Sequence, residues 1–357
     1  MTAPILTVEG LTKSYPGAAG LFRAPARATV VDRVSFRVER GGTFGLVGES
    51  GSGKSTIGRA VLRLIEPDAG TIRFDGTDVR ALDVAGLVRL RRRMQIIFQD
   101  PFSSLDPRVR IGRAIAEPIR LHRLRSGALV ERRVDELLEL VGLGPHHRNR
   151  FPHEFSGGQR QRVAIARALA VEPEFIVCDE PVSALDVSIQ AQVLNLLEEL
   201  RDRLGVSFLF ISHDMAVVRH FASHVGVLYA GTLVETGPAG AIFADPRHPY
   251  TRMLLAATPS LAPERRGRGE EVAGEPPSPF ARVEGCPFAS RCAHATAVCE
   301  TEKPPLDAYR AGDRKAACWH AAELPRHGMA ADDESLMSEA YRRRMALLRA
   351  ARTAAHA

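Results

Sequence analysis

The first 100 residues carry the short apolar patterns of strands and one longer pattern of a helix. Residues 34–39 alternate apolar and polar side chains, which is typical of a half-buried strand. Residues 43–47 are a short apolar run, and a helical pattern follows from residue 54 to about residue 64. A strand, a glycine-rich loop and a helix are therefore expected in that order.

Helical patterns then alternate with apolar strands. Residues 103–150 are expected to be mostly helical, and a second helical pattern covers residues 157–170, with Ser156 as a suitable N-cap. Residues 175–178 and 206–211 are continuous apolar runs, which fits strands buried on both faces. One helix between them has its apolar face at Ile189, Val193, Leu196, Leu197, Leu200 and Leu204. This alternation predicts an α/β fold with a parallel sheet covered by helices.

The pattern changes after about residue 261. Residues 262–285 are rich in Pro, Gly, Glu and Arg and have little periodic apolar pattern, as in a linker. A cysteine-containing segment follows, and residues 332–352 have the pattern of a basic amphipathic helix. No internal repeat is present in the sequence. We expect a main domain at 1–261 with a helical subdomain at about 100–170, an extension at 262–320 and a basic helical tail at 321–357.

The composition is that of an ordinary globular protein. Of 357 residues, 45% are hydrophobic, and 48 Lys and Arg against 42 Asp and Glu give a formal net charge of +6. This mild charge permits contact with anionic lipid or nucleic acid without requiring it. No run approaches the roughly 18 apolar residues of a membrane span, and the N-terminus lacks the pattern of a signal peptide. We expect a cytosolic chain with reduced cysteines.

One glycine-rich segment carries the clearest chemical signal. Gly48-Glu-Ser-Gly-Ser-Gly-Lys-Ser-Thr56 fits the phosphate-loop pattern G-x-x-x-x-G-K-[ST]. Its glycines let backbone N–H groups turn toward phosphate oxygens, and the following helix points its positive dipole end at the same place. Lys54 would face the β- and γ-phosphates, and the Ser55 hydroxyl would bind Mg²⁺. A strand before the loop and a helix after it complete the prediction of a nucleotide site.

An acidic pair follows the apolar strand at residues 175–178. Asp179 comes at the carboxyl end of this strand, where α/β sheets bind their ligands. Asp179 is suited to hold Mg²⁺ and Glu180 to polarise the attacking water, because phosphoryl transfer requires mainly positioning and charge stabilisation. Cys178, inside the strand, is expected to be a small core residue.

Two further polar residues follow apolar strands. Gln99 comes after the run at residues 96–98, and His213 comes after the strand that ends at Ile211. A lone Gln or His would carry little weight, but both lie at strand ends of the sheet that carries the phosphate loop. We therefore expect both side chains to sense the γ-phosphate.

With these residues, Phe155-Ser-Gly-Gly-Gln-Arg-Gln-Arg162 and Ser183-Ala-Leu-Asp186 closely resemble the motifs of an ABC-type ATP-binding cassette, in the family's order. The departure from the usual motif is Phe155 in place of Leu. The resemblance implies a P-loop ATPase with a RecA-like parallel sheet core, an antiparallel β subdomain and a helical subdomain. It implies ATP and Mg²⁺ as ligands, with Glu180 and His213 as catalytic residues.

The resemblance also implies a pair of cassettes. Serine and two glycines at a helix N-terminus form a second anion site, which in the family closes over the ATP of a second cassette. The signature residues are Ser156, Gly157, Gly158 and Gln159, and Asp186 belongs to the D-loop. The residues expected to bind ATP and Mg²⁺ are Tyr15, Gly48, Ser50, Gly51, Gly53, Lys54, Ser55, Thr56, Gln99 and Asp179.

A finer resemblance points to the ATP-binding subunits of oligopeptide/dipeptide permeases. It rests on residues 96–108 and 178–190 and on His248-Pro-Tyr-Thr251, and it covers about residues 5–320. Gly20-Leu-Phe22 resembles the F-type paralogue. In this family an aromatic ring near the N-terminus stacks on adenine, and Tyr15 is the candidate. A membrane subunit docks at about residues 99–119, where burial in the helical subdomain is the alternative role of Phe102 and Leu105.

The implied function is ATP hydrolysis that powers an importer of peptides or related small solutes. The implied partners are a second cassette (paralogue or self), two integral membrane permease subunits and, indirectly, an extracytoplasmic solute-binding protein. The chain would lie peripherally at the cytoplasmic face of the inner membrane, with no nucleic acid partner. The alternative is a soluble ABC ATPase that acts on nucleic acid or ribosomes, although the 57 positions from Gln99 to Ser156 leave no room for a long coiled-coil insertion.

Four late cysteines form a separate candidate site. Cys286, Cys292, Cys299 and Cys318 are separated by five, six and eighteen residues. The spacing lacks the C-x₂₋₄-C pair of typical zinc sites. The flanking sequences resemble the C-terminal region of peptide-permease ATPases, which can hold a [4Fe–4S] cluster, and this is the expected cofactor. Zinc, or reduced cysteines in a small hydrophobic cluster, are the alternatives.

Overall fold

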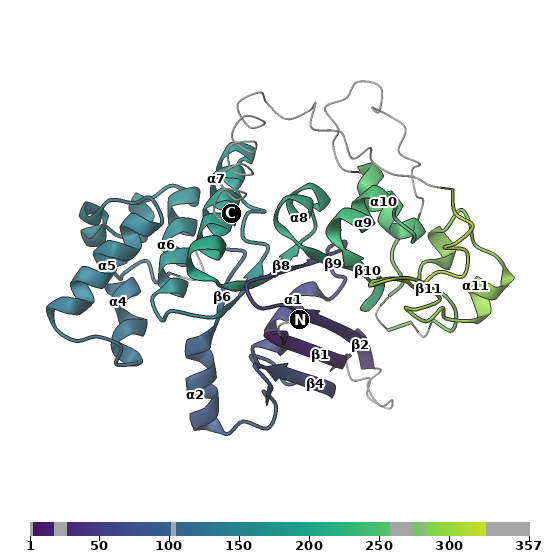
Figure 1. Cartoon of the computed structure of the whole chain (residues 1–357), viewed down its shortest axis with the longest axis horizontal. Helices are drawn as coiled ribbons and strands as arrows, with labels where there is room; N and C mark the ends of the chain where they lie inside the picture. The colour runs from purple at the N-terminus through teal and green to yellow at the C-terminus, as the bar shows by residue number, and fades with distance from the viewer. Residues whose placement is uncertain are drawn as a thin grey trace, which may run out of the picture.

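Two sheets form the centre of the molecule. The computed structural model describes residues 3–17, 27–100, 105–257, 274–278, 280–281 and 283–325. A smaller antiparallel sheet has the strand order β2-β1-β4-β5, and an eight-stranded sheet has the order β11-β12-β10-β9-β3-β8-β7-β6 (Figure 1). The strands of the smaller sheet are β1 (Leu6–Pro16), β2 (Arg27–Val38), β4 (Ala69–Phe74) and β5 (Thr77–Asp78).

The middle of the larger sheet is parallel. Strands β6 (Met94–Ile97), β7 (Phe175–Asp179), β8 (Ser207–Ser212), β3 (Thr43–Val47) and β9 (His224–Tyr229) run side by side in one direction. Along β7, Phe175 and Val177 face the core shared with the smaller sheet, whereas Ile176 and Cys178 face the core shared with the helices. The strand is buried on both faces, as its apolar run predicts, and the prediction that Cys178 is a core residue is confirmed.

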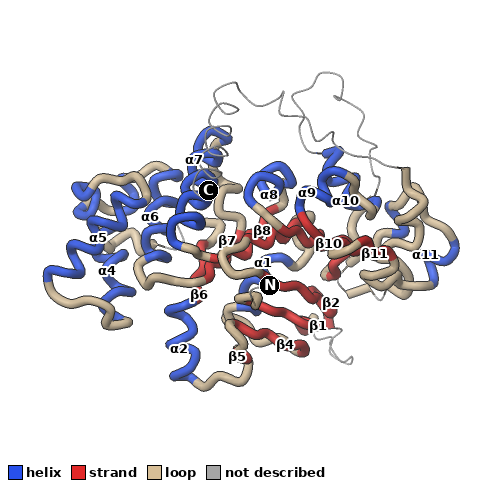
Figure 2. The backbone as a smooth tube through the Cα atoms, in the orientation of Figure 1, coloured by secondary structure: helices blue, strands red, loops and turns tan. Residues whose placement is uncertain are grey.

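Helices cover the larger sheet, and a group of helices forms a subdomain beyond one of its edges. Figure 2 shows α4, α5 and α6 grouped beyond the β6 edge. Buried Ile115, Val134 and Leu137 belong to the core of this helical subdomain. The helices are α1 (Lys54–Val61), α2 (Val84–Arg93), α4 (Ile111–Leu121), α5 (Ala128–Leu140), α6 (Gly157–Leu169), α7 (Val187–Leu204), α8 (Met215–Phe221), α9 (Ala239–Ala244), α10 (Pro249–Ala257) and α11 (Ala297–Thr301). No helix in the described ranges is long and apolar enough to cross a membrane.

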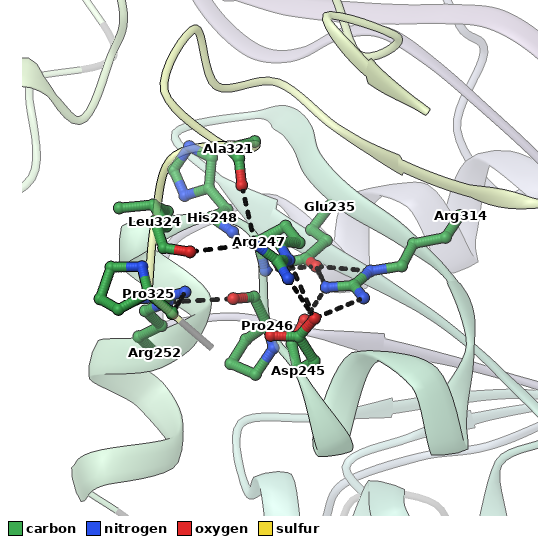
Figure 3. A network of polar contacts seen from close by, with 10 residues as sticks. All are labelled: Glu235, Asp245, Pro246, Arg247, His248, Arg252, Arg314, Ala321, Leu324 and Pro325. Carbon is green, nitrogen blue, oxygen red and sulfur yellow. Dashed lines mark hydrogen bonds and ion pairs between the residues drawn. The ribbon is translucent and has the colours of Figure 1, made fainter. Parts of the chain in front are cut away.

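The C-terminal extension continues the larger sheet. Strand β10 (Thr232–Pro238) pairs antiparallel with β12 (Arg314–Ala316), which pairs with β11 (Tyr309–Ala311). The fully buried Glu235 on β10 accepts hydrogen bonds from Arg314 and from the backbone N–H groups of Arg247 and His248 (Figure 3). Arg247 donates in turn to the carbonyl oxygens of Ala321 and Leu324. The extension is thereby attached to β10 through charged groups that are largely removed from water.

Several sequence expectations lie outside the described residues. They are Phe102, the insertion at residues 20–22, the first part of the predicted linker and the tail helix at residues 332–352. The described part of the linker, residues 274–278, 280–281 and 283–285, contains no helix or strand. Leu105 is buried in the helical core, as its alternative role requires.

Candidate functional site: a phosphate loop at the carboxyl ends of the parallel strands

The phosphate loop lies between β3 and α1. Two of its glycines are required by close backbone contacts. A Cβ on Gly48 would lie 2.1 Å from the Leu228 carbonyl oxygen, and a Cβ on Gly53, whose φ is +104°, would lie 2.5 Å from the Val30 carbonyl oxygen. Neither position accepts a side chain without movement of a neighbouring strand, so the loop is fitted closely between β9 and β2.

Lys54 and Ser55 begin α1 and point their polar groups at the loop and at β7. Lys54 Nζ donates to the carbonyl oxygens of Gly48 and Glu49, at 2.8 Å each. Burial lowers the pKa of Lys54, and three nearby carboxylates oppose this shift. Ser55 Oγ donates to Asp179 Oδ1 at 2.6 Å, and burial raises the pKa of Asp179. The hydroxyl and the carboxylate are hard oxygen ligands of the kind that Mg²⁺ prefers.

The other predicted polar side chains of the site follow the carboxyl ends of three neighbouring strands, and they lie close together. Gln99 follows β6, Glu180 follows β7 and His213 follows β8. Glu180 Oε2 accepts a hydrogen bond from Gln99 Nε2 at 3.1 Å, and His213 Nδ1 lies 3.1 Å from the same oxygen. Glu180 has a φ of +49°, a conformation that side-chain-bearing residues rarely adopt and that is often found at functional sites.

These groups line a common cleft of about 630 Å³. Its predicted members are Ser50, Gly51, Gly53, Lys54, Ser55, Thr56, Gln99, Glu180 and His213. The structure therefore brings the phosphate loop, the acidic residue and both predicted sensors together. Val30, Glu49 and Leu254 also line the cleft. Sequence reasoning missed these three, although Glu49 lies at a variable position inside the loop motif.

The signature residues lie elsewhere. Ser156 caps α6, and its Oγ accepts from the Gln159 N–H, whose side chain accepts in return from the Ser156 N–H. Gly158 is fitted against Ile189, because a Cβ there would lie 2.4 Å from Ile189 Cγ2. None of residues 156–159 is among the described residues that line the cleft, and Asp186 is exposed at the start of α7. The chain does not bring its own signature to its own phosphate loop.

Tyr15 lies near the C-terminal end of β1. Its ring is 38% exposed, and Lys13 Nζ lies 5.2 Å from the ring centre. Tyr15 pairs with Ala28 on β2, next to Arg27 and Thr29, which line a second and larger cavity of about 810 Å³ beside the phosphate loop. In the structure as described, Tyr15 itself lines neither this cavity nor the cleft.

The four late cysteines converge. Cys286, Cys292, Cys299 and Cys318 all line one cavity of about 20 Å³. Burial raises the pKa of the Cys286 and Cys292 thiols, and it raises that of Cys318 to about 12. Among the described residues, however, no three His, Cys, Asp or Glu side chains are grouped so that they could hold a metal ion. The four cysteines thus line one small cavity, but the structure gives no support to the predicted iron–sulfur cluster or to zinc.

Comparison with known proteins assigns the relatives. Residues 31–183 match the ABC transporter family, and residues 234–299 match the oligopeptide/dipeptide transporter C-terminal region. A putative peptide import ATP-binding protein of Brucella ovis is 51% identical over 313 residues, which cover 88% of this chain and 97% of that protein. The dipeptide transport ATP-binding protein DppF of Haemophilus influenzae is 45% identical over 317 residues, with coverage of 89% and 97%.

Solved structures share the fold. CbiO1 from Clostridium perfringens, part of an ABC transporter complex, aligns with a TM-score of 0.58 and 27% identity over 67% of this chain and 90% of its own. A dimeric ATP-binding cassette bound to ADP and Pi aligns with a TM-score of 0.59 and 29% identity over 66% and 98%. The predicted α/β cassette fold is confirmed. On these similarities the chain belongs to the ABC transporter ATP-binding subunits of the oligopeptide/dipeptide type.

Proposed function

We propose that this chain is the ATP-hydrolysing subunit that powers import of peptides or related small solutes. The names of its relatives support this function, including the F-type assignment through the relative called DppF. The alternative, an ATPase that acts on nucleic acid or ribosomes, has no such support. The observation that carries the hydrolytic role is the convergence of Gln99 and His213 on Glu180 beside the phosphate loop.

Each predicted site residue, in the cleft or beside it, has a distinct proposed role. Lys54 and the loop N–H groups of residues 48–53 bind the phosphates, and Ser55 and Asp179 hold Mg²⁺. When bound, Mg²⁺ neutralises charge on the phosphate oxygens. Glu180 orients and polarises the attacking water as a general base, because its carboxylate is fixed at the end of β7. Gln99 and His213 contact the γ-phosphate, and Tyr15 stacks on adenine.

The test of this assignment is the change Glu180→Gln, which keeps the shape of the side chain and removes its basicity. We expect ATP binding to persist and hydrolysis to fall by a factor of roughly 10² to 10⁴, the usual contribution of a general base. The matched control is Glu199→Gln, because Glu199 is exposed and, among the described residues, forms its ion pair with Arg203 on the same helix. Undiminished turnover in Glu180→Gln would remove the proposed catalytic role.

The proposed assembly has further members. A second cassette, identical or paralogous, supplies its own residues 156–159 and Asp186 to the nucleotide. Two integral membrane subunits dock at residues 99–119, and a solute-binding protein acts with them outside the membrane. The chain then lies peripherally at the cytoplasmic face of the inner membrane. Purification from gently solubilised membranes should recover two polytopic proteins with the chain, whereas recovery with ribosomes alone would contradict this proposal.

We also propose a [4Fe–4S] cluster, with zinc as the alternative, at the four cysteines of the extension; this proposal rests on the resemblance of the flanking sequences, and the four cysteines line one cavity. Bound there, a cluster would stabilise a segment that has few regular elements of its own. The test is to measure the content of iron and of acid-labile sulfide in the chain after purification without oxygen. The same measurement on Cys292→Ser shows whether that content depends on the cysteines. Absence of both iron and sulfide from the unaltered chain contradicts the proposal.

We also propose the domain limits 1–261, 262–320 and 321–357.

A further inference from the structure

Glu49, inside the phosphate loop, is held at three separate atoms or groups. Its backbone N–H donates to the Tyr250 hydroxyl at 2.8 Å. Its carbonyl oxygen accepts from Lys54 Nζ at 2.8 Å. Its carboxylate accepts two hydrogen bonds from Arg291, from Nη1 to Oε2 and from Nη2 to Oε1, at 3.0 Å each. The side chain that fixes the carboxylate therefore comes from the extension, 242 positions away in the sequence.

Arg291 is well placed to act as a rigid link. Its side chain is 8% exposed and the side chain of Glu49 is 27% exposed, so the ion pair is shielded from most of the solvent. The guanidinium lies 5.8 Å from the ring centre of Tyr229 and 5.7 Å from that of Phe288. A planar, two-pronged ion pair packed against two aromatic rings defines the orientation of both partners.

The backbone of Arg291 belongs to the cysteine segment. Arg291 is the last residue of a short 3₁₀ helix (Ala289–Arg291), and Cys292 follows it directly. The Ala289 N–H donates to the Cys286 carbonyl oxygen, and the Cys292 N–H donates to the Ala289 carbonyl oxygen. The Cys286 N–H donates to the Cys299 carbonyl oxygen at 2.7 Å. The position of Arg291 therefore depends on how the cysteine segment is folded.

The other side of the extension is fixed to the sheet. The group around Glu235 in Figure 3 attaches β12 to β10, and Arg247 attaches residues 321–324. The extension thus has a firm attachment at β10, and it contacts the main domain separately at the phosphate loop through Arg291 and at Asp32 through Lys303. Because the first attachment is independent of the loop, a change in the cysteine segment can move Arg291 without detaching the extension.

We propose that Arg291 is a positioning residue that fixes the phosphate loop through Glu49 and so makes ATP affinity depend on the folding of the cysteine segment. The inference rests on the proposed ATP site. A loop that is already in its binding conformation loses less conformational entropy when phosphate binds. Removal of Arg291 also leaves Glu49 with an uncompensated and partly buried charge beside the phosphates, which opposes an anionic ligand.

The experiment measures the dissociation constant of ATP for the full-length chain and three variants. They are Arg291→Met, Glu49→Gln and the double variant. We expect roughly tenfold weaker binding in Arg291→Met, within the range of coupling between contacting charged residues. The double variant should bind no more weakly than the weaker single variant, because the two residues act through one contact. Arg291→Lys, which keeps the charge without the fork, should bind with intermediate affinity.

Arg252→Gln is the matched control. Arg252 links the main domain to the residues that follow the extension, through a hydrogen bond to the Pro325 carbonyl oxygen, and its other hydrogen bond in the described part of the chain is to Pro246 rather than to the loop. Equal ATP affinity in Arg291→Met and Arg252→Gln would overturn the inference, as would additive losses in the double variant. If Arg291→Met does not fold, Arg291→Lys decides, because it keeps the charge and loses only the two-pronged contact, so that affinity equal to that of the unaltered chain contradicts the proposal. Failure of the unaltered chain to bind ATP would instead contradict the proposed function.

A second set of variants tests the dependence on the cysteine segment. Cys286→Ser should weaken ATP binding in the unaltered background, because the Cys286 side chain packs against the hydrophobic core just before the 3₁₀ helix that carries Arg291, where a hydroxyl group is poorly accommodated. The same change in the Glu49→Gln background should have little further effect, since the contact that transmits it is already lost. An equal effect of Cys286→Ser in both backgrounds would show that the segment acts by another route.

Discussion

Gly158, in the signature segment, lacks a side chain for a reason of packing. A Cβ there would lie 2.4 Å from Ile189 Cγ2, whereas a Cβ on the neighbouring Gly157 would lie at an ordinary 3.5 Å from Leu185 Cδ2. We expect Gly158→Ala to destabilise the chain by about 1 kcal/mol, because overpacking exceeds the gain in helix propensity. Gly157→Ala should be neutral or stabilising. Thermal unfolding measures the stability of both glycine variants. Adding Ile189→Ala to Gly158→Ala should restore part of the lost stability. Equal stability of the two glycine variants would contradict the packing argument.

The place of a residue in the phosphate site could be predicted where it depends on the local sequence alone. Lys54 and Ser55 stand at fixed positions after the glycines, and Asp179 and Glu180 stand at the end of an apolar run. Arg291 was not predictable, because its contact with Glu49 joins residues 242 positions apart. No periodicity or motif spacing relates such residues, and only the folded chain brings them together.

Arg93, the last residue of α2, connects the two sheets. Its guanidinium donates to both carboxylate oxygens of Glu174, just before β7, and to Asp75, just after β4. These hydrogen bonds lower the pKa of Glu174 and of Asp75. Because all three side chains are more than a third exposed, we expect Arg93→Met to lower stability by only about 1 kcal/mol at pH 7.

The pH dependence of this effect has a definite sign. Carboxyl groups with lowered pKa values in the folded state stabilise it above their unfolded pKa values, and the stabilisation is lost as the pH falls through the folded values. The difference between Arg93→Met and the unaltered chain should therefore shrink below about pH 4.5. Urea unfolding at pH 7 and pH 4 measures this difference in the free energy of unfolding. Arg203→Met, at an exposed position on α7, is the control. A difference that grows on acidification would contradict the assignment.

Regular elements with strong periodicity were predictable, and elements that depend on their neighbours were not. The parallel strands appear as apolar runs because helices and a second sheet cover both faces. Helix α2 escaped prediction, although Asp83 caps it by accepting from the Gly86 N–H at 2.7 Å. Strands β11 and β12 have three residues each, and their pairing with β10 depends on long-range contacts such as Arg314 with Glu235.

At the scale of the whole molecule, the described residues that line the cleft do not include the predicted signature residues 156–159, so one chain alone does not complete the nucleotide site that we propose. The surface at the start of α7 is also open: Asp186 is exposed, and Val187 beside it is 81% exposed. The N-terminus of α6, capped by Ser156, and the exposed Val187 are the features at which we expect a second cassette to close over the ATP. ATP bound between two cassettes stabilises the pair by mass action, so pairing should require nucleotide.

This argument gives the last prediction. In Glu180→Gln, where we expect ATP to bind and to be hydrolysed slowly, the chain should pair in the presence of ATP and Mg²⁺, either with itself or with its paralogous cassette. Light scattering on a size-exclusion column measures the shift from the 38.9 kDa of one chain. Ser156→Arg in the same background should abolish pairing, because it fills the anion site at the α6 N-terminus without altering the phosphate loop. Pairing that survives Ser156→Arg, or that needs no ATP, would place the contact on another face.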